Sequence, residues 1–140
     1  MRTISTLCLA LIVLLNACKK DDEAKFASAE GNWTYTTSDG KISVDFTLVK
    51  SGTTWNVTNP VIRVDGTAGN AEVISSGVNP PAIQSIRINA NDAKLTYDYS
   101  IEFDNATVNS DFTQITVPGG TYTWPIDKTN NLANITITRK

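Results

Sequence analysis

A strict alternation of apolar and polar side chains along residues 94–104 constrains the fold more than any other feature of the chain. The apolar members of this series are Leu95, Tyr97, Tyr99, Ile101 and Phe103. A helix would distribute such a series around its whole circumference, whereas a β-strand places every second side chain on the same face. The segment is therefore predicted to be a strand with one buried face and one solvated face.

Similar signals recur along the chain from Gly31 onward. Residues 42–48 repeat the alternation after an Asp39-Gly40 step, which favours a tight hairpin. Further segments rich in Val, Ile, Thr and aromatic residues end at Gly, Asn, Asp or Pro, as short strands do. These segments are 32–37, 54–57, 61–64, 71–75, 83–89, 112–117, 121–124 and 134–139. The pattern predicts an all-β fold, with an antiparallel β-sandwich of immunoglobulin-like or similar type as the first choice and a small closed barrel as the alternative.

The first 17 residues have the order of a secretion signal rather than of a folded element. A basic residue, Arg2, precedes an apolar run from Leu7 to Leu15, and the small Ala17 stands directly before Cys18. A run of this length is typical of a signal peptide and is too short to span a bilayer permanently. We therefore expect cleavage immediately before the cysteine.

The Leu-Asn-Ala-Cys order of residues 15–18 resembles the lipobox of bacterial lipoproteins. The resemblance implies that Cys18 becomes the first mature residue and carries a diacylglycerol group with palmitate-type chains, which would anchor the protein in a membrane. Lys20, Asp21 and Asp22 resemble the export signal of surface lipoproteins in Bacteroidota. This second resemblance implies an outer-membrane protein that faces the cell exterior, with a periplasm-facing lipoprotein as the alternative.

Three parts follow from these signals: a lipoprotein signal peptide over 1–17, a lipidated cysteine with a charged flexible tether over 18–29, and a single β domain over 30–140. The mature chain is long enough to bury one core. Its 11 basic and 14 acidic residues include no basic cluster. We therefore expect no nucleic-acid partner, because binding to phosphate backbones needs such a cluster.

The chain contains no histidine, and its two cysteines are Cys8 and Cys18. Loss of Cys8 with the signal leaves no disulfide. Without histidine, the usual general base and zinc ligand are missing, so we expect no catalytic residues, no metal site and no cofactor. The carboxylates of Asp98, Glu102 and Asp104 lie along one strand face, where residues four apart are separated by about 13 Å, too far for a glycosidase pair.

Gly31-Asn32-Trp33, at the head of the first predicted strand, is similar to the Gly-x-Trp motif of lipocalin-like barrels. In that family the tryptophan closes one end of the barrel, and a basic residue of the last strand packs across its ring. Arg139 holds that position here. The resemblance implies structural roles for Trp33 and Arg139, and a barrel that carries a small apolar ligand.

Three aromatic side chains stand near predicted loop ends: Trp55 before Asn59-Pro60, and Tyr122 and Trp124 after Pro118-Gly119-Gly120. Such rings can cover the apolar face of a sugar while amide and carboxylate groups bond its hydroxyls. The sequence therefore predicts a non-enzymatic binding or interaction module, with a glycan as the first candidate ligand. A carrier of a small apolar ligand, and a structural or adhesive component with a surface-protein partner, stay open as alternatives.

Overall fold

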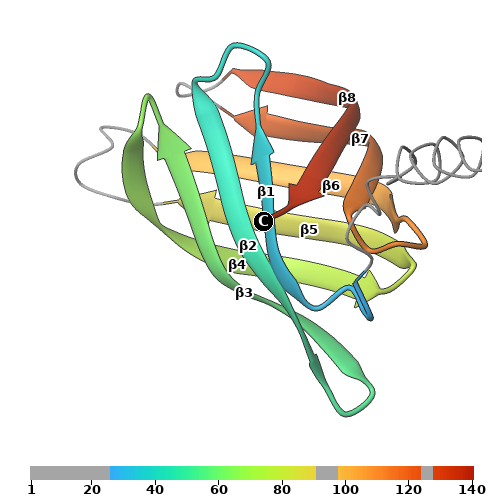
Figure 1. The fold of residues 1–140 in the computed structure, drawn as a ribbon. Helices are drawn as coiled ribbons and strands as arrows, with labels where there is room; N and C mark the ends of the chain where they lie inside the picture. The colour runs from blue at the N-terminus through green and yellow to red at the C-terminus, as the bar shows by residue number, and fades with distance from the viewer. Residues whose placement is uncertain (1–25, 91–97, 124–127) are drawn as a thin grey trace, which may run out of the picture.

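The computed structural model describes residues 26–90, 98–123 and 128–140, which form one antiparallel barrel (Figure 1). Its strands are β1 (Gly31–Thr36), β2 (Ile42–Ser51), β3 (Thr54–Val64), β4 (Thr67–Asn79), β5 (Ala82–Ala90), β6 (Tyr99–Val108), β7 (Gln114–Thr123) and β8 (Thr129–Arg139). Each strand pairs with the next, and β8 pairs back with β1. In the described part of the chain, no helix has the length and apolar character needed to cross a membrane.

The all-β prediction is confirmed, and the closed barrel, in keeping with the lipocalin-like alternative, replaces the sandwich. The predicted sandwich is wrong because β8 returns to β1 at two residue pairs, Trp33 with Arg139 and Thr34 with Thr138. The β3–β4 ladder is also short. The β1–β8 and β3–β4 ladders, both short, therefore join β1–β3 to β4–β8. The alternation of side chains is a local pattern, so it could not show whether distant strands close a barrel.

Two predicted loops lie inside strands, which reduces ten short predicted strands to eight longer ones. Asn59-Pro60 belongs to β3, where Asn59 has a φ of 50° and the pairing with β2 shifts by one residue, as in a β-bulge. Pro118-Gly119-Gly120 belongs to β7. There β6 approaches so closely that a Cβ at Gly120 would collide with the carbonyl oxygen of Glu102. Asn59-Pro60 therefore marks a bulge, and Pro118-Gly119-Gly120 marks a close approach of two strands, rather than chain reversal.

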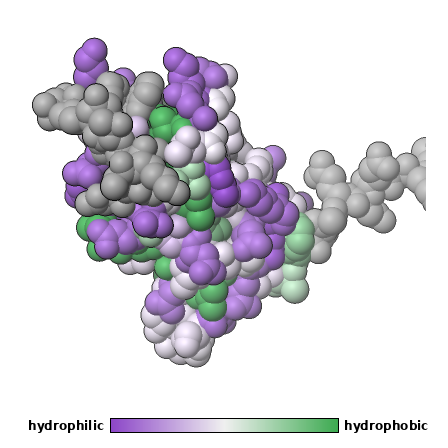
Figure 2. All heavy atoms as spheres, turned by 90° about the vertical axis from the view of Figure 1, so that its left-hand side faces the viewer, coloured by the Kyte–Doolittle hydropathy of each residue, from purple (hydrophilic) through white to green (hydrophobic). Residues whose placement is uncertain are grey.

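The interior of the barrel is filled by apolar side chains. The ring of Phe103 lies 5.9 Å from that of Tyr35, edge to face, and 6.4 Å from that of Phe46. Among the described residues, every buried side chain is apolar or aromatic. Hydrophilic residues cover much of the outer face seen in Figure 2, with apolar residues scattered between them. The inward and outward alternation expected from the sequence thus separates a packed core from a solvated surface.

The two ends of the barrel differ. We call the end at Gly31 and Arg139 the closed end; it also carries the β2–β3 turn and residues 109–113. The open end carries residues 37–41 and the Asp65-Gly66 turn. Antiparallel strands alternate in direction, so each connection can be assigned to one end from the strand order alone.

Arg139 covers the closed end. Its guanidinium donates hydrogen bonds to the carbonyl oxygens of Ser28 (2.6 Å), Phe112 (3.3 Å) and Glu30. The same group lies 3.8 Å from the centroid of the Phe26 ring and 5.7 Å from that of Trp33. One side chain of the last strand therefore joins the segment before β1 to the β6–β7 loop.

Trp33 and Gly31 fit around this arginine. Trp33 is fully buried, and its indole nitrogen donates a 3.0 Å hydrogen bond to the carbonyl oxygen of Ala29. Gly31 has a φ of 137°, which L side chains rarely adopt, and a Cβ there would lie 2.6 Å from Nη2 of Arg139. The glycine of the Gly-x-Trp sequence is needed here for both its backbone conformation and its lack of a side chain.

The folded part begins earlier than residue 30. Ala29 is fully buried, and the Phe26 amide donates a 3.2 Å hydrogen bond to the carbonyl oxygen of Asp111. Residues 26–29, predicted to belong to the flexible tether, therefore pack against the closed end. Short polar and small residues such as Ala27 and Ser28 give no periodic signal, so the sequence could not show this docking.

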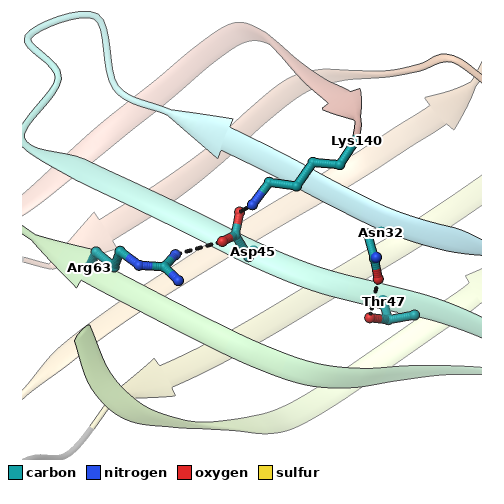
Figure 3. Close-up of polar contacts among 5 residues, drawn as sticks. All are labelled: Asn32, Asp45, Thr47, Arg63 and Lys140. Atoms are coloured by element: carbon teal, nitrogen blue, oxygen red, sulfur yellow. Dashed lines mark hydrogen bonds and ion pairs between the residues drawn. The ribbon is translucent and has the colours of Figure 1, made fainter. Parts of the chain in front are cut away.

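Ion pairs of Asp45 join the end of the chain to β2, and β2 to β3. Asp45 on β2 contacts Arg63 of β3 at 2.5 Å and Lys140 at 2.7 Å (Figure 3). The backbone amide of Lys140 also donates a 3.0 Å hydrogen bond to the carbonyl oxygen of Asn32. Partial burial raises the pKa of the Asp45 carboxyl, but hydrogen bonds from Lys140, Thr34 and Arg63 together lower this pKa below its ordinary value.

Replacement of Asp45 by Asn should reduce the dependence of stability on pH in acid. A carboxyl whose pKa is lower in the folded than in the unfolded protein stabilises the fold at pH values above the unfolded pKa of about 3.9. This contribution disappears as the pH falls through the folded pKa. Urea unfolding at neutral pH should show a loss of about 1 kcal/mol in Asp45→Asn. The loss should shrink toward zero as the pH falls below the unfolded pKa and through the lowered folded pKa of this carboxyl.

The exposed carboxyl of Glu72 on β4 provides the control. Glu72→Gln should remain close to the unmodified protein at both pH values. Equal acid sensitivity of Asp45→Asn and the unmodified protein would contradict the assignment of this carboxylate as a stabilising ion-pair partner.

Candidate functional site

A pocket of about 270 Å³ lies at the open end, between β1 and β8. The two strands are paired only near the closed end, and β1 stops at Thr36 while β8 extends back to Thr129. The strands therefore separate toward the open end (Figure 1). We call this space the seam pocket, because it arises where the barrel closes incompletely.

Two tyrosines and the end of β8 form the walls of the seam pocket. Tyr35 comes from β1 and Tyr122 from β7, while Asn131, Leu132 and Ile135 come from β8. Tyr35 is 8% exposed and rests against the packed interior through Phe103. Phenol hydroxyls and an amide thus stand beside apolar side chains, an arrangement that can bond a polar ligand and cover its apolar face.

The connection between β1 and β2 forms the rim of the pocket. Asp39 Oδ1 accepts hydrogen bonds from the Thr37 hydroxyl (2.6 Å) and from the backbone amide of Lys41 (3.1 Å). These hydrogen bonds lower the pKa of the Asp39 carboxyl, and the one from the Thr37 hydroxyl has the larger effect. The carboxylate is therefore ionised at neutral pH, and Asp39 is exposed at the rim.

The phenol of Tyr35 has a raised pKa. Burial is the largest cause, and the nearby Tyr122 phenol and Asp39 carboxylate add to it, because each disfavours a second negative charge. The three groups are therefore close enough to interact electrostatically. The hydroxyl of each tyrosine can donate as well as accept hydrogen bonds.

The predicted binding residues do not form one site. Tyr122 lines the seam pocket, but Trp55 lies at the start of β3, at the closed end of the barrel. Trp55 and Tyr122 therefore stand at opposite ends of the barrel, because β3 begins at the end where β7 also begins, while Tyr122 stands near the far end of β7. Trp124 lies outside the described residues, as do Cys18 and the segment 20–22.

Sequence reasoning missed Tyr35, Asp39 and Asn131 as site residues. Tyr35 lies in the predicted strand 32–37 and Asp39 in the predicted hairpin step, so each has a structural explanation from the sequence alone. Their proximity depends on closure between β1 and β8. In the described part of the chain, no cluster of three or more carboxylate, thiol or imidazole side chains is arranged to hold a metal ion.

Comparisons with known proteins add no relative. No protein-family model matches the chain, and no curated protein or solved structure is significantly similar to it. Any function must therefore be argued from the seam pocket and from the sequence signals.

Removal of the Tyr122 hydroxyl should lower the pKa of Tyr35. In Tyr122→Phe the second phenol can no longer become negative beside it, so the pKa of Tyr35 should move toward the ordinary value of 10.0. Titration of the Tyr35 Cζ resonance by NMR measures this shift. Tyr99→Phe, a change to a buried tyrosine on β6, should leave the titration of Tyr35 unaltered, and the same result for Tyr122→Phe would contradict the geometry of the pocket.

Proposed function

We propose that this chain is a non-enzymatic lipoprotein of the bacterial outer membrane that binds a neutral, hydroxyl-rich ligand, such as a terminal sugar of a glycan, in the seam pocket. The observation that carries the proposal is the combination of two tyrosines, Asp39 and Asn131 around one space of about 270 Å³. The lipid anchor at Cys18 and exposure to the cell exterior are part of the proposal and rest on the N-terminal sequence.

The size of the pocket favours a small ligand. Pockets for drug-sized molecules usually measure about 300–1,000 Å³, so the seam pocket suits a ligand at or below the lower limit of that range. It is also open on one side, because β1 and β8 do not meet there. A sugar at the end of a longer chain fits both features, since the rest of the glycan can extend into solvent.

The polar groups favour a neutral ligand. Asp39 carries the only formal charge among the described residues that line the pocket, and Lys41 lies near enough to lower the pKa of its carboxyl further. An anionic ligand would meet this carboxylate at the rim. Sugar hydroxyls can instead donate to Asp39 and exchange hydrogen bonds with the tyrosine hydroxyls and the Asn131 amide.

The packed interior argues against the alternative of a lipocalin-like carrier. Phe46 and Phe103 occupy the centre of the barrel and are at most 1% exposed, so an apolar ligand would have to displace core side chains. The barrel and its covered closed end agree with the lipocalin-like resemblance in architecture. The ligand site that we propose differs, because it lies at the seam rather than along the barrel axis.

Binding of glycans to the mature lipoprotein tests this proposal. A glycan array should identify neutral sugars, and calorimetry with the best of them should show about tenfold or greater weakening in Asp39→Asn, since hydrogen bonds to a charged group contribute about 1.5–3 kcal/mol. Asn131→Ala should weaken binding by about two- to tenfold.

Trp55→Phe is the matched control, because it changes an aromatic side chain at the opposite end of the barrel, and it should leave glycan affinity unchanged. Trp124→Ala tests the aromatic platform expected from the sequence. Binding of fatty acids or other apolar ligands, with no effect of Asp39→Asn, would replace the glycan proposal with the carrier.

A further inference from the structure

The β2–β3 hairpin extends beyond the barrel at the closed end. β1 pairs with β2 no further than Leu48, and β4 pairs with β3 only from Val61 onward. Among the described strands, residues 49–58 therefore pair only across their own hairpin, which projects from the lower end of the barrel in Figure 1. We call residues 49–60 the hairpin arm. The part of β2 beyond Leu48 alone adds about 10 Å of length.

The composition of the arm differs from that of the rest of the chain. Lys50 is its only charged residue, in a mature protein with more acidic than basic side chains. Val49 is 38% exposed, one of the most exposed large apolar residues in the described part of the chain. Lys50 Nζ lies 5.9 Å from the centroid of the half-buried Trp55 ring. The lower end of the molecule is correspondingly pale in Figure 2.

The arm emerges beside the point where the N-terminal segment reaches the barrel. The Glu30 carboxylate accepts a 2.9 Å hydrogen bond from the backbone amide of Lys50. Phe26 is held at the same end through Asp111 and Arg139. Phe26 lies eight positions after Cys18, and a fully extended chain over these eight steps spans at most about 29 Å. A lipid on Cys18 would therefore keep the closed end, and the arm with it, close to the bilayer.

We propose that the hairpin arm is a second membrane contact, which lies in the interface of the same bilayer that holds the acyl chains of Cys18. The proposal rests on the lipid anchoring included in the proposed function. Tryptophan is enriched at membrane interfaces, where its ring is apolar and its N–H remains hydrated. Lys50 adds attraction to anionic headgroups, and the arm has no acidic residue that would oppose it.

This contact would fix the orientation of the binding site. The seam pocket lies at the open end, away from the arm. A barrel held through both Cys18 and the arm turns the pocket toward the medium. A barrel held by the tether alone would be free to tilt, because a short flexible tether fixes distance but not direction.

The experiment uses the mature lipoprotein reconstituted in vesicles of phosphatidylethanolamine and phosphatidylglycerol. Thr53→Cys places an environment-sensitive fluorophore at the tip of the arm, and Thr67→Cys places the same fluorophore next to the Asp65-Gly66 turn at the open end. Both positions are exposed threonines at hairpin turns. The probe at residue 53 should show a blue-shifted emission and several-fold slower reduction by dithionite than the probe at residue 67.

A charge on the arm should release it from the lipid. Val49→Glu should return the emission and reduction rate of the residue 53 probe to those of the residue 67 probe. Ile74→Glu, which places the same charge at an exposed apolar position on β4, should leave the residue 53 probe shielded. Val49 and Ile74 both point partly into solvent, so neither change needs to disturb the core.

Two outcomes would overturn the proposal, and they are distinguishable. Equal emission and reduction rates for the two probes, in protein whose mass shows a lipidated Cys18, would remove the arm contact and leave the proposed function intact. A mass without lipid on Cys18, with no flotation on vesicles, would remove the anchoring and this inference together. Glycan binding is measured separately and does not depend on either result.

Discussion

The arrangement of Arg139 at the closed end is the interaction on which the rest of the structure depends. A planar guanidinium can donate several hydrogen bonds at once while its face rests on an aromatic ring, which no other side chain does. Here it bonds carbonyl groups from the segment before β1 and from the β6–β7 loop, and it contacts the rings of Phe26 and Trp33. Burial lowers the pKa of Arg139, but an arginine keeps its charge at any physiological pH.

Closure at one end has a direct consequence at the other. β1 and β8 meet for two residue pairs, next to Arg139, and then separate. The same seam thus provides a covered end and an open pocket. Because Phe46 and Phe103 fill the barrel axis, the space available to a ligand lies at the edge of the barrel and not inside it. Residues 26–29 pack at the closed end, so a lipid anchor on the preceding segment would hold that end near the membrane. The pocket, at the other end, would then face away from the proposed membrane contact.

The sequence predicted what depends on neighbouring residues and missed what depends on distant ones. Alternation identified β2 and much of β6, since a period of two is a local property. Closure of β8 onto β1 joins residues about a hundred positions apart, and nothing near Thr34 or Thr138 signals it. Asn59-Pro60 resembled a loop because Asn and Pro are common in turns. Asn59 does have a positive φ, but it adopts it in a β-bulge inside β3. The seam pocket was unpredictable for the same reason, because Tyr35, Asp39 and Asn131 come together only after closure.

The free energy of unfolding of Arg139→Lys tests the central claim most directly. Lysine keeps the charge but cannot bond several fixed carbonyl groups in one plane, so we expect a loss of at least about 2 kcal/mol in urea unfolding. Arg87→Lys, at an exposed position of β5, should change the free energy by about 0.5 kcal/mol or less. Equal and small effects of the two substitutions would show that the closed end is held by something other than Arg139.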